Sequence, residues 1–289
     1  MNNKLAYLIT TLCLSISLPL YADYEEPNDP NAMFDLAFRY YNGDGVKKNY
    51  AEAFKWFRKA AYKGNTVAMY NLAVCYNGGI GVEKNPAEAV RWWLRAADRG
   101  YADAMYKLGE RYRSGYGVDK SIPKSIEWYQ KAVKYYKDAA DRGDSDAMYK
   151  LGRCYLEGRG VFKSEEKGKE LYEKAAQCGN TNAMYDFAQH YRRYDEQFYN
   201  SEYRRLLERA AWGGHIQAMY ELGLGLREAS EDVVFGRTNV VNYSLHSEAV
   251  EWIRKAAKLG HEDAKRTLNW LRNEARYRRS YGDGFDGEL

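Results

Sequence analysis

The chain has little proline, with 5 residues of this type among 289, so few positions interrupt a helix. Cysteine is scarce as well. Cys13 falls in an N-terminal apolar run, which leaves Cys75, Cys154 and Cys178 in the rest of the chain. An odd number excludes a fully disulfide-bonded framework, and we expect mostly free, buried thiols. Charge of one sign is also lacking, because 44 Lys and Arg face 40 Asp and Glu. That balance excludes the basic domain typical of nucleic-acid binding.

Long apolar runs are absent except at the N-terminus. Residues 5–20 are mostly apolar, follow Lys4, and give way after Ala22 to an acidic stretch that begins at Asp23. This pattern predicts a secretory signal peptide over 1–22, cleaved after Ala22. A retained anchor is the alternative, but the run is short for a membrane span. We therefore expect a mature protein without a membrane span, in the periplasm or secreted.

Motifs for catalysis or metal binding are missing. None of the four histidines has metal-ligand spacing; they are His190, His215, His246 and His261. Ser121 and Lys124 match the Ser-x-x-Lys element of penicillin-recognising enzymes, but its companion elements are absent. Ser121 aligns instead with helix-capping positions of other repeats. We expect no catalytic site, no metal and no cofactor.

What the chain does contain is one string repeated six times, Ala-Met-aromatic. It begins at Ala32, Ala68, Ala104, Ala147, Ala183 and Ala218. A period of this length indicates one supersecondary unit copied in tandem, whose copies bury their apolar faces only by stacking. The repeated methionines are predicted to lie in the core rather than to bind a metal.

Within a repeat, the pattern predicts a helix, a glycine turn and a second helix. Ala68, Leu72 and Tyr76 recur every four residues, as on one face of a helix. The stretch 79–82 reads Gly-Ile-Gly-Val, where a left-handed glycine ends the first helix. A second apolar face at helical spacing follows within 89–96. The fold class is therefore all-α.

The repeat pattern also predicts the organisation of the chain. We expect a flexible segment over 23–30, about six helix-turn-helix repeats over 31–263, a capping helix over 264–279 and a mobile tail over 280–289. The third repeat has seven extra residues, which predict a longer second helix. The fifth repeat loses its glycine turn near 192–196. The sixth carries an insertion within Arg227–Ser247, which either folds back on the array or contacts a partner.

The third repeat resembles the Sel-one-like repeat family, relatives of the tetratricopeptide repeats. The matching residues are Ala104, Leu108, Gly109, Tyr112, Gly115, Gly117, Val118, Ser121, Trp128, Tyr129, Lys131 and Ala132. The resemblance implies a right-handed superhelical solenoid of helix pairs. It also implies an adaptor or scaffold, since many bacterial members are secreted or periplasmic and bind other proteins, including host proteins.

Two sets of residues are candidates for partner binding. Corresponding places in the third and fourth repeats hold the cations Lys107, Arg111, Lys150 and Arg153. The aromatic residue of the repeated string gives a possible aromatic ladder through Tyr106, Tyr149 and Tyr185. The alternatives are a solvated charged face and ordinary packing between helix pairs. Other repeats have an acid in the place of Lys107, so we expect the inner surface to change sign along the array.

These observations together favour a non-catalytic interaction module that binds a protein or peptide of unknown identity on its concave face. We expect it to be a monomer. A bacterial host-interaction or toxin-neutralising factor using the same surface is the alternative. An enzyme directed at β-lactams or the cell wall is a remote one.

Overall fold

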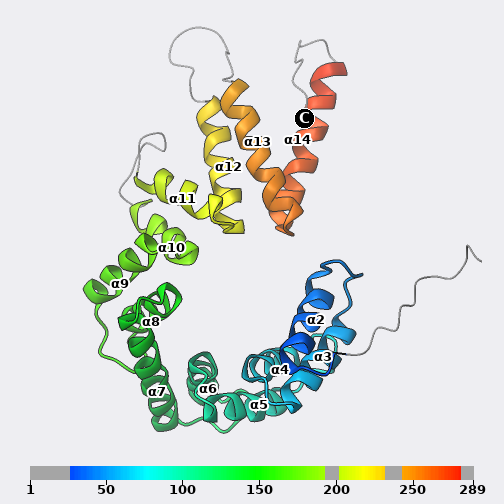
Figure 1. The fold of residues 1–289 in the computed structure, drawn as a ribbon. Helices are drawn as coiled ribbons and strands as arrows, with labels where there is room; N and C mark the ends of the chain where they lie inside the picture. The colour runs from blue at the N-terminus through cyan, green and yellow to red at the C-terminus, as the bar shows by residue number, and fades with distance from the viewer. Residues whose placement is uncertain (1–26, 193–201, 232–242, 281–289) are drawn as a thin grey trace, which may run out of the picture. The chain divides into compact units, whose positions relative to one another are not determined.

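The computed structural model describes residues 27–192, 202–231 and 243–280 (Figure 1). Within these ranges the chain forms thirteen helices and no strand, which confirms the all-α fold. The first helices of the repeats are α2 (Pro30–Asn42), α4 (Thr66–Gly78), α6 (Ala102–Ser114), α8 (Ser145–Glu157), α10 (Thr181–Tyr191) and α12 (Ile216–Glu231). The second helices are α3 (Tyr50–Tyr62), α5 (Pro86–Asp98), α7 (Ile122–Asp141), α9 (Glu165–Gln177), α11 (Glu202–Trp212) and α13 (Tyr243–Lys258).

The last helix, α14 (Glu262–Ser280), covers the stretch predicted as a cap. The predicted signal peptide over 1–22 lies outside the described residues, as do 23–26 of the predicted flexible segment, 193–201, 232–242 and 281–289 of the predicted tail. Most of the insertion in the sixth repeat and most of the altered turn in the fifth fall in these gaps. In the part of the chain that is described, no helix is both long and apolar enough to cross a bilayer.

Side chains at the helix starts explain where the second helices begin. Asn49, Asn85, Ser121 and Ser164 each accept a hydrogen bond from a backbone N–H in the first turn of α3, α5, α7 or α9. Such caps satisfy backbone donors that have no partner within the helix. The capping role predicted for Ser121 and for the equivalent positions of other repeats is confirmed.

The two glycines of the turn are required for different structural reasons. Gly79 ends α4 in the left-handed conformation, with a φ of 71°. Gly81 is required for lack of space as well, because an added Cβ would clash with the backbone oxygen of Tyr50. The second glycine therefore lets the turn approach the second helix of the preceding repeat, a requirement that the sequence pattern did not reveal.

The described chain divides into two compact units. One contains α2 to α5, up to Ala104, together with Gly115–Asp119; the other contains Met105–Ser114 and the chain from Lys120 onward. Within each unit, helices that are consecutive in the chain pack side by side, as Figure 1 shows for α2 to α5 and for α7 to α14. This is the stacking that the tandem repeat predicts.

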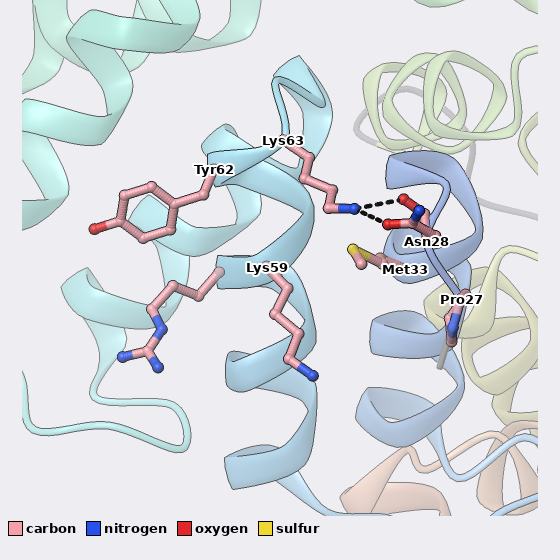
Figure 2. Close-up of a pocket in the computed structure, with 7 residues that line it drawn as sticks. Pro27, Asn28, Met33, Lys59, Tyr62 and Lys63 are labelled. Carbon is pink, nitrogen blue, oxygen red and sulfur yellow. Dashed lines mark hydrogen bonds between the residues drawn. The ribbon is translucent and has the colours of Figure 1, made fainter. Parts of the chain in front are cut away.

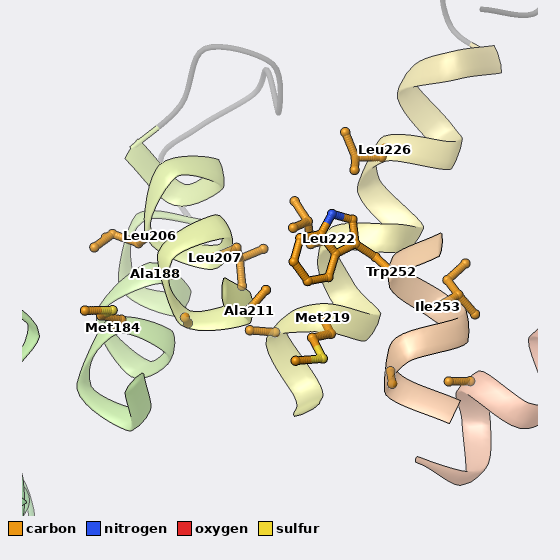
Figure 3. Close-up of a cluster of buried hydrophobic side chains, with 14 of the residues drawn as sticks. Met184, Ala188, Leu206, Leu207, Ala211, Met219, Leu222, Leu226, Trp252 and Ile253 are labelled. Atoms are coloured by element: carbon orange, nitrogen blue, oxygen red, sulfur yellow. The ribbon is translucent and has the colours of Figure 1, made fainter. Parts of the chain in front are cut away.

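Apolar side chains from successive helix pairs form continuous cores. Figure 3 shows part of the core of the second unit, where Met184, Leu207, Met219, Leu222 and Ile253 come from α10 to α13. Five of the six repeated methionines are buried, and the sixth, Met148, is partly buried against the same core. The prediction that these methionines lie in the core is confirmed.

The cysteines are free thiols, as expected, but they are not all buried. Cys75 and Cys154 are buried, whereas Cys178 is exposed. Cys178 occupies the C-cap of α9, outside the helical face that packs against the neighbouring pair. Cys178 is therefore the exception to the expectation of mostly buried thiols.

The seven extra residues of the third repeat extend α7 to 20 residues, against 13 in α5 and α9, as predicted. They also shift the register of the next repeat. An added Cβ at Gly117 would meet Pro86, the first residue of α5. The equivalent Cβ at Gly160 would meet Tyr129, seven residues into α7. The fourth repeat thus packs about two helical turns further along its neighbour, or about 10 Å.

Candidate interaction surface

A tyrosine in one repeat hydrogen bonds to the first helix of the next. The hydroxyl of Tyr149 donates to Oδ2 of Asp186 at 2.9 Å, and that of Tyr185 donates to Oε1 of Glu221 at 2.7 Å. Tyr220 and Thr267 continue the series at 3.1 Å. Asp186 and Glu221 each lie two residues after the repeated methionine, and Thr267 has the corresponding place in α14.

Tyr106 makes the same kind of contact in a shifted register. Its hydroxyl donates to Oε2 of Glu157 at 3.1 Å. Glu157 lies seven residues beyond Lys150, which has the place that Asp186 and Glu221 have in their repeats. The shift equals the seven extra residues of α7, so the longer helix and the changed partner have one cause.

The candidate tyrosines therefore act in packing between repeats. Tyr106 is 4% exposed, and Tyr149 and Tyr185 are half-buried with their hydroxyls engaged. Other rings cover them further, as His215, which directly precedes α12, does by stacking on Tyr185 with 4.4 Å between centroids. A role of these tyrosines in partner binding stays a prediction, limited to the ring edges that remain accessible.

The acids in the place of Lys107 are not free surface charges in the fifth and sixth repeats. Glu221 accepts from Tyr185, from Gln189 at 2.7 Å and from Gln217 at 2.9 Å. Burial acts to raise the pKa of Glu221, but these hydrogen bonds outweigh it and lower the pKa. The expected change of sign along the inner surface is thus reduced, because these acids are used within the fold.

The candidate cations of the third and fourth repeats lie on α6 and α8. We call Lys107, Arg111, Lys150 and Arg153 the α6/α8 basic surface. Two of its ion pairs join neighbouring turns of one helix: Lys107 Nζ lies 2.9 Å from Glu110 Oε2, and Lys150 Nζ lies 2.6 Å from Asp146 Oδ2. Arg111 lies one turn after Lys107 and is half-buried. The surface is therefore mixed in charge rather than uniformly basic.

Two guanidinium groups are held around the ring of Tyr106. That of Arg153 lies 4.8 Å from the ring centroid and that of Arg159 lies 5.7 Å away. Glu157 pairs with both, at 3.6 Å from Arg153 Nε and 2.6 Å from Arg159 Nε. Burial acts to lower the pKa of Arg153, but Tyr106 and Glu157 raise it, so this arginine stays charged.

Arg159 is a member of this cluster that sequence reasoning did not single out. It is the middle residue of the Gly158–Gly160 turn, a place that differs in every repeat, so periodicity carries no signal there. Its NH1 group donates to the Tyr129 hydroxyl at 2.6 Å. The turn thus carries a cation to the surface between the third and fourth repeats.

Cations on the second helices have a structural role instead. On α3, α5, α7 and α13, one cation lies over a tryptophan three residues earlier on its own helix, at 4.2 to 4.4 Å from the ring centroid. The pairs are Trp56 with Lys59, Trp92 with Arg95, Trp128 with Lys131 and Trp252 with Lys255. This recurrence indicates a structural cation–π contact rather than a site.

The Ser-x-x-Lys element is part of a helix start. Ser121 Oγ accepts from the backbone N–H of Lys124 at 3.4 Å, and Lys124 Nζ lies 5.5 Å from the ring centroid of Tyr112. The predicted cap is therefore confirmed. In the described residues, no three His, Cys, Asp or Glu side chains gather in an arrangement suited to a metal ion.

A hollow of about 640 Å³ lies beside α2 and α3. Its lining combines the segment before α2 with the end of α3, and consists of Pro27, Asn28, Met33, Arg58, Lys59, Tyr62 and Lys63. Figure 2 shows Lys63 reaching across to Asn28, whose backbone oxygen accepts from Lys63 Nζ at 2.8 Å, while Tyr62 points away from α2. The lining is cationic, but Lys63 is engaged within the fold.

Comparison with known proteins identifies the repeat. A family model described as Sel1 repeat matches residues 30–65, 66–101, 102–144, 145–180 and 242–261. No curated protein sequence matches the chain. Among solved structures, a Sel1 repeat protein from Oxalobacter formigenes is 32% identical, with 80% of this chain and 88% of that chain covered and a TM-score of 0.50.

Two immunity proteins from Pseudomonas aeruginosa share the fold at lower identity. One is 20% identical over 83% of this chain and 86% of its own, with a TM-score of 0.53. The other is 17% identical over 82% of this chain and 83% of its own, with a TM-score of 0.52. Because the repeat model covers more than half of the sequence and the Oxalobacter protein resembles most of it, the chain belongs to the Sel1 repeat family.

Proposed function

We propose that this protein is an exported, non-catalytic interaction module that binds a protein or peptide through the α6/α8 basic surface. Sel1 repeats generally mediate protein interactions, and the chain belongs to that family. The signal-peptide pattern over 1–22 supports export to the periplasm or beyond. A partner that presents acidic side chains suits the excess of cations on this surface.

The observation that carries the proposal is the arginine cluster around Tyr106. Arg153 and Arg159 are positioned by the ring and by Glu157 before any partner arrives. A guanidinium that is already ordered loses less side-chain entropy on binding and offers several donors to a carboxylate. Lys107 and Lys150 add charges whose ion pairs, with Glu110 and Asp146, span one turn of their own helices. Partly exposed pairs of this kind are weak and open readily to a competing carboxylate.

A host-interaction or toxin-neutralising role is the alternative use of this surface. The immunity proteins are too distant in sequence to carry more than the fold.

The proposal is tested by crosslinking and pull-down from an envelope extract of the source cells, with captured proteins identified by mass spectrometry. The test variant combines Lys107→Gln with Lys150→Gln. The control variant combines Lys131→Gln with Lys174→Gln, which removes the equivalent pairs with Glu127 and Glu170 on the second helices.

We expect the test variant to lose most of the captured partner while its melting temperature stays near that of the parent protein. The control variant should capture the partner normally. Equal capture by the two variants would remove the α6/α8 basic surface from consideration. Covalent labelling of the protein by a fluorescent penicillin, if abolished by Ser121→Ala, would instead favour the remote enzymatic alternative.

A further inference from the structure

A second hollow, of about 380 Å³, lies between α12 and α14 in the second unit. Its lining joins two cations to apolar and aromatic walls, and consists of Leu224, Arg227, Arg266, Thr267 and Trp270. Trp270 is 50% exposed, so the hollow is open to a ligand from solvent. No acidic side chain belongs to this lining.

Arg227 is the unusual member of the lining. Its guanidinium lies 5.3 Å from the ring centroid of Trp270, and its Nε is buried without a hydrogen-bond partner. Among the residues that the structure describes, no carboxylate pairs with it. The Nε atoms of Arg153 and Arg159 also lack a well-formed hydrogen bond, but Glu157 lies beside both of them, and Arg227 has no such carboxylate. The ring orders the guanidinium while leaving donors at its edge for another group.

The contact between the fifth and sixth repeats shows what is missing at the contact between the sixth repeat and α14. Arg192 lies eight residues after Met184, as Arg227 lies eight residues after Met219. Arg192 NH1 lies 4.0 Å from Glu221 Oε2.

At the junction between the sixth repeat and α14, Thr267 has the place that Glu221 has at the preceding junction. Each of the two pairs with the tyrosine of the preceding repeat, Glu221 with Tyr185 and Thr267 with Tyr220. A threonine supplies no negative charge. The chain therefore provides a carboxylate beside the arginine at one junction and a hollow beside it at the next.

We propose that this hollow binds the C-terminal carboxylate of a peptide whose last residue is apolar. The carboxylate would accept from Arg227 in the way that a charged pair forms elsewhere in the array. In a C-terminal residue, the carboxylate and the apolar side chain leave the same carbon. Both groups therefore fit a hollow where Arg227 lies against Trp270 and Leu224. The inference deepens the proposed function, on which it rests, by naming a ligand class for a second place on the same array.

An acidic side chain is the less suitable ligand. Aspartate and glutamate carry no apolar group beyond their short methylene chains, so they would leave the Trp270 and Leu224 walls uncovered. Arg266 pairs with Asp263 at 2.9 Å on the exposed side of α14 and can add a second charge, whereas Arg227 has no carboxylate beside it in the described residues. The ligand is expected to contribute one carboxylate and one apolar group.

The test uses the whole mature protein and three small probes. The probes are N-acetyl-leucine, its primary amide, and N-acetyl-glutamate with an amidated α-carboxyl group. Binding is followed by NMR through the indole N–H signal of Trp270, which is assigned by its loss in Trp270→Phe. We expect saturable shifts with N-acetyl-leucine and none with the amide, because only the former presents a carboxylate beside an apolar side chain.

Three variants make the test specific. Arg227→Gln should weaken N-acetyl-leucine binding by about tenfold or more, since it removes a charge-assisted hydrogen bond. Thr267→Glu should abolish binding by supplying the carboxylate from within the chain, as Glu221 does for Arg192. This variant should also fold at least as stably as the parent. Arg272→Gln is the matched control for the loss of one arginine. Arg272 is exposed on α14, outside the lining of the hollow, and this variant should bind normally.

Equal binding of the amide, or an unchanged affinity in Arg227→Gln, would overturn the proposal. Equal binding of the glutamate probe would also overturn it, in favour of an acidic side chain. Failure here is distinguishable from failure of the proposed function, because partner capture through the α6/α8 basic surface is measured with variants on other helices.

Discussion

The hydroxyl of Tyr185 on α10 donates a 2.7 Å hydrogen bond to the Glu221 carboxylate on α12. Gln189 and Tyr203 also reach this carboxylate from the fifth repeat, and Gln217 reaches it from its own helix. The side chain of Glu221 is only 16% exposed. A charge at that depth needs such donors, so the junction between these repeats depends on side chains from both.

Removing the Tyr185 hydroxyl should weaken this junction. Tyr185→Phe deletes one donor to a mostly buried carboxylate, and we expect a loss of about 2 kcal/mol in the free energy of unfolding. Urea unfolding measures the loss, and peptide-level hydrogen exchange should localise it to α10 and α12. The matched control is Tyr135→Phe, at a position that is 46% exposed. Equal losses in the two variants would show that the hydroxyl contact has no particular role.

Stability should also fall in mildly acidic solution because of His215. This residue starts α12, and its Nδ1 accepts from the backbone N–H of Ala218 at 3.1 Å. Burial lowers the pKa of His215 below its ordinary value of 6.5, against the opposing effect of Asp186 and Glu221. The unfolded chain thus binds a proton more readily than the folded chain. The contribution of neutral His215 to the free energy of unfolding is therefore complete above its ordinary pKa. It declines as the pH falls through the lower pKa of the folded state.

The measurement is the free energy of unfolding between about pH 7.5 and pH 5. The informative variant is His215→Asn, because Asn180 caps α10 in the corresponding place without titrating in this range. We expect the variant to flatten the pH dependence, whatever its stability at pH 7.5. A slope that survives the substitution would assign the effect to other groups.

A methyl group at Gly152 should destabilise the fourth repeat. Its Cβ would lie 2.7 Å from Cδ1 of Tyr172 and 3.0 Å from the backbone oxygen of Gly168. Helix propensity alone would make Gly152→Ala stabilising by about 1 kcal/mol. Overpacking should reverse the sign and leave a net loss of about 1–3 kcal/mol, measured by urea unfolding.

Tyr172→Leu should relieve that crowding. The fifth repeat has Ala188 and Leu207 in the corresponding places, and both are fully buried. In a double-mutant cycle, Gly152→Ala should therefore cost less in the Tyr172→Leu background than in the parent protein. Additive effects would mean that the contact between the two helices is looser than the structure indicates.

Export should leave a defined N-terminus. Expression of the full sequence in a bacterial host with a secretory pathway should yield protein in the periplasm, with an intact mass that starts at Asp23. Substituting Arg for Leu12 in the apolar run should keep the protein unprocessed, because a charge there disrupts the signal sequence. A mature mass that still includes residues 1–22 would contradict the predicted cleavage.

Periodicity was sufficient to predict the helices, their caps and the buried faces. Positions such as Asn85 and Met69 recur at fixed places in the repeat, and each has one structural reason that applies to every copy. The longer α7 was predictable too, because seven residues extend the same apolar face. What could be predicted from sequence is what the repeats share.

Contacts between repeats were not predictable in the same way, because they depend on register. Lys107 and Lys150 align in the sequence, yet the shift at α7 places Glu157, not Lys150, beside Tyr106. Arg159 and Arg227 act through neighbours that differ from one junction to the next. The residues that distinguish one junction from another are therefore the least visible in the repeat pattern, as Arg159 and Arg227 show.

The length of α7 has a consequence for how such arrays diversify. Seven residues are close to a whole number of helical turns, so the insertion returns each side chain to nearly the same angle around the helix axis. An insertion of five would rotate the buried face toward solvent. Length changes near seven or eleven residues alter the neighbours that meet across a junction while they preserve the hydrophobic interior. New surface chemistry can then arise between old repeats without any substitution in their cores.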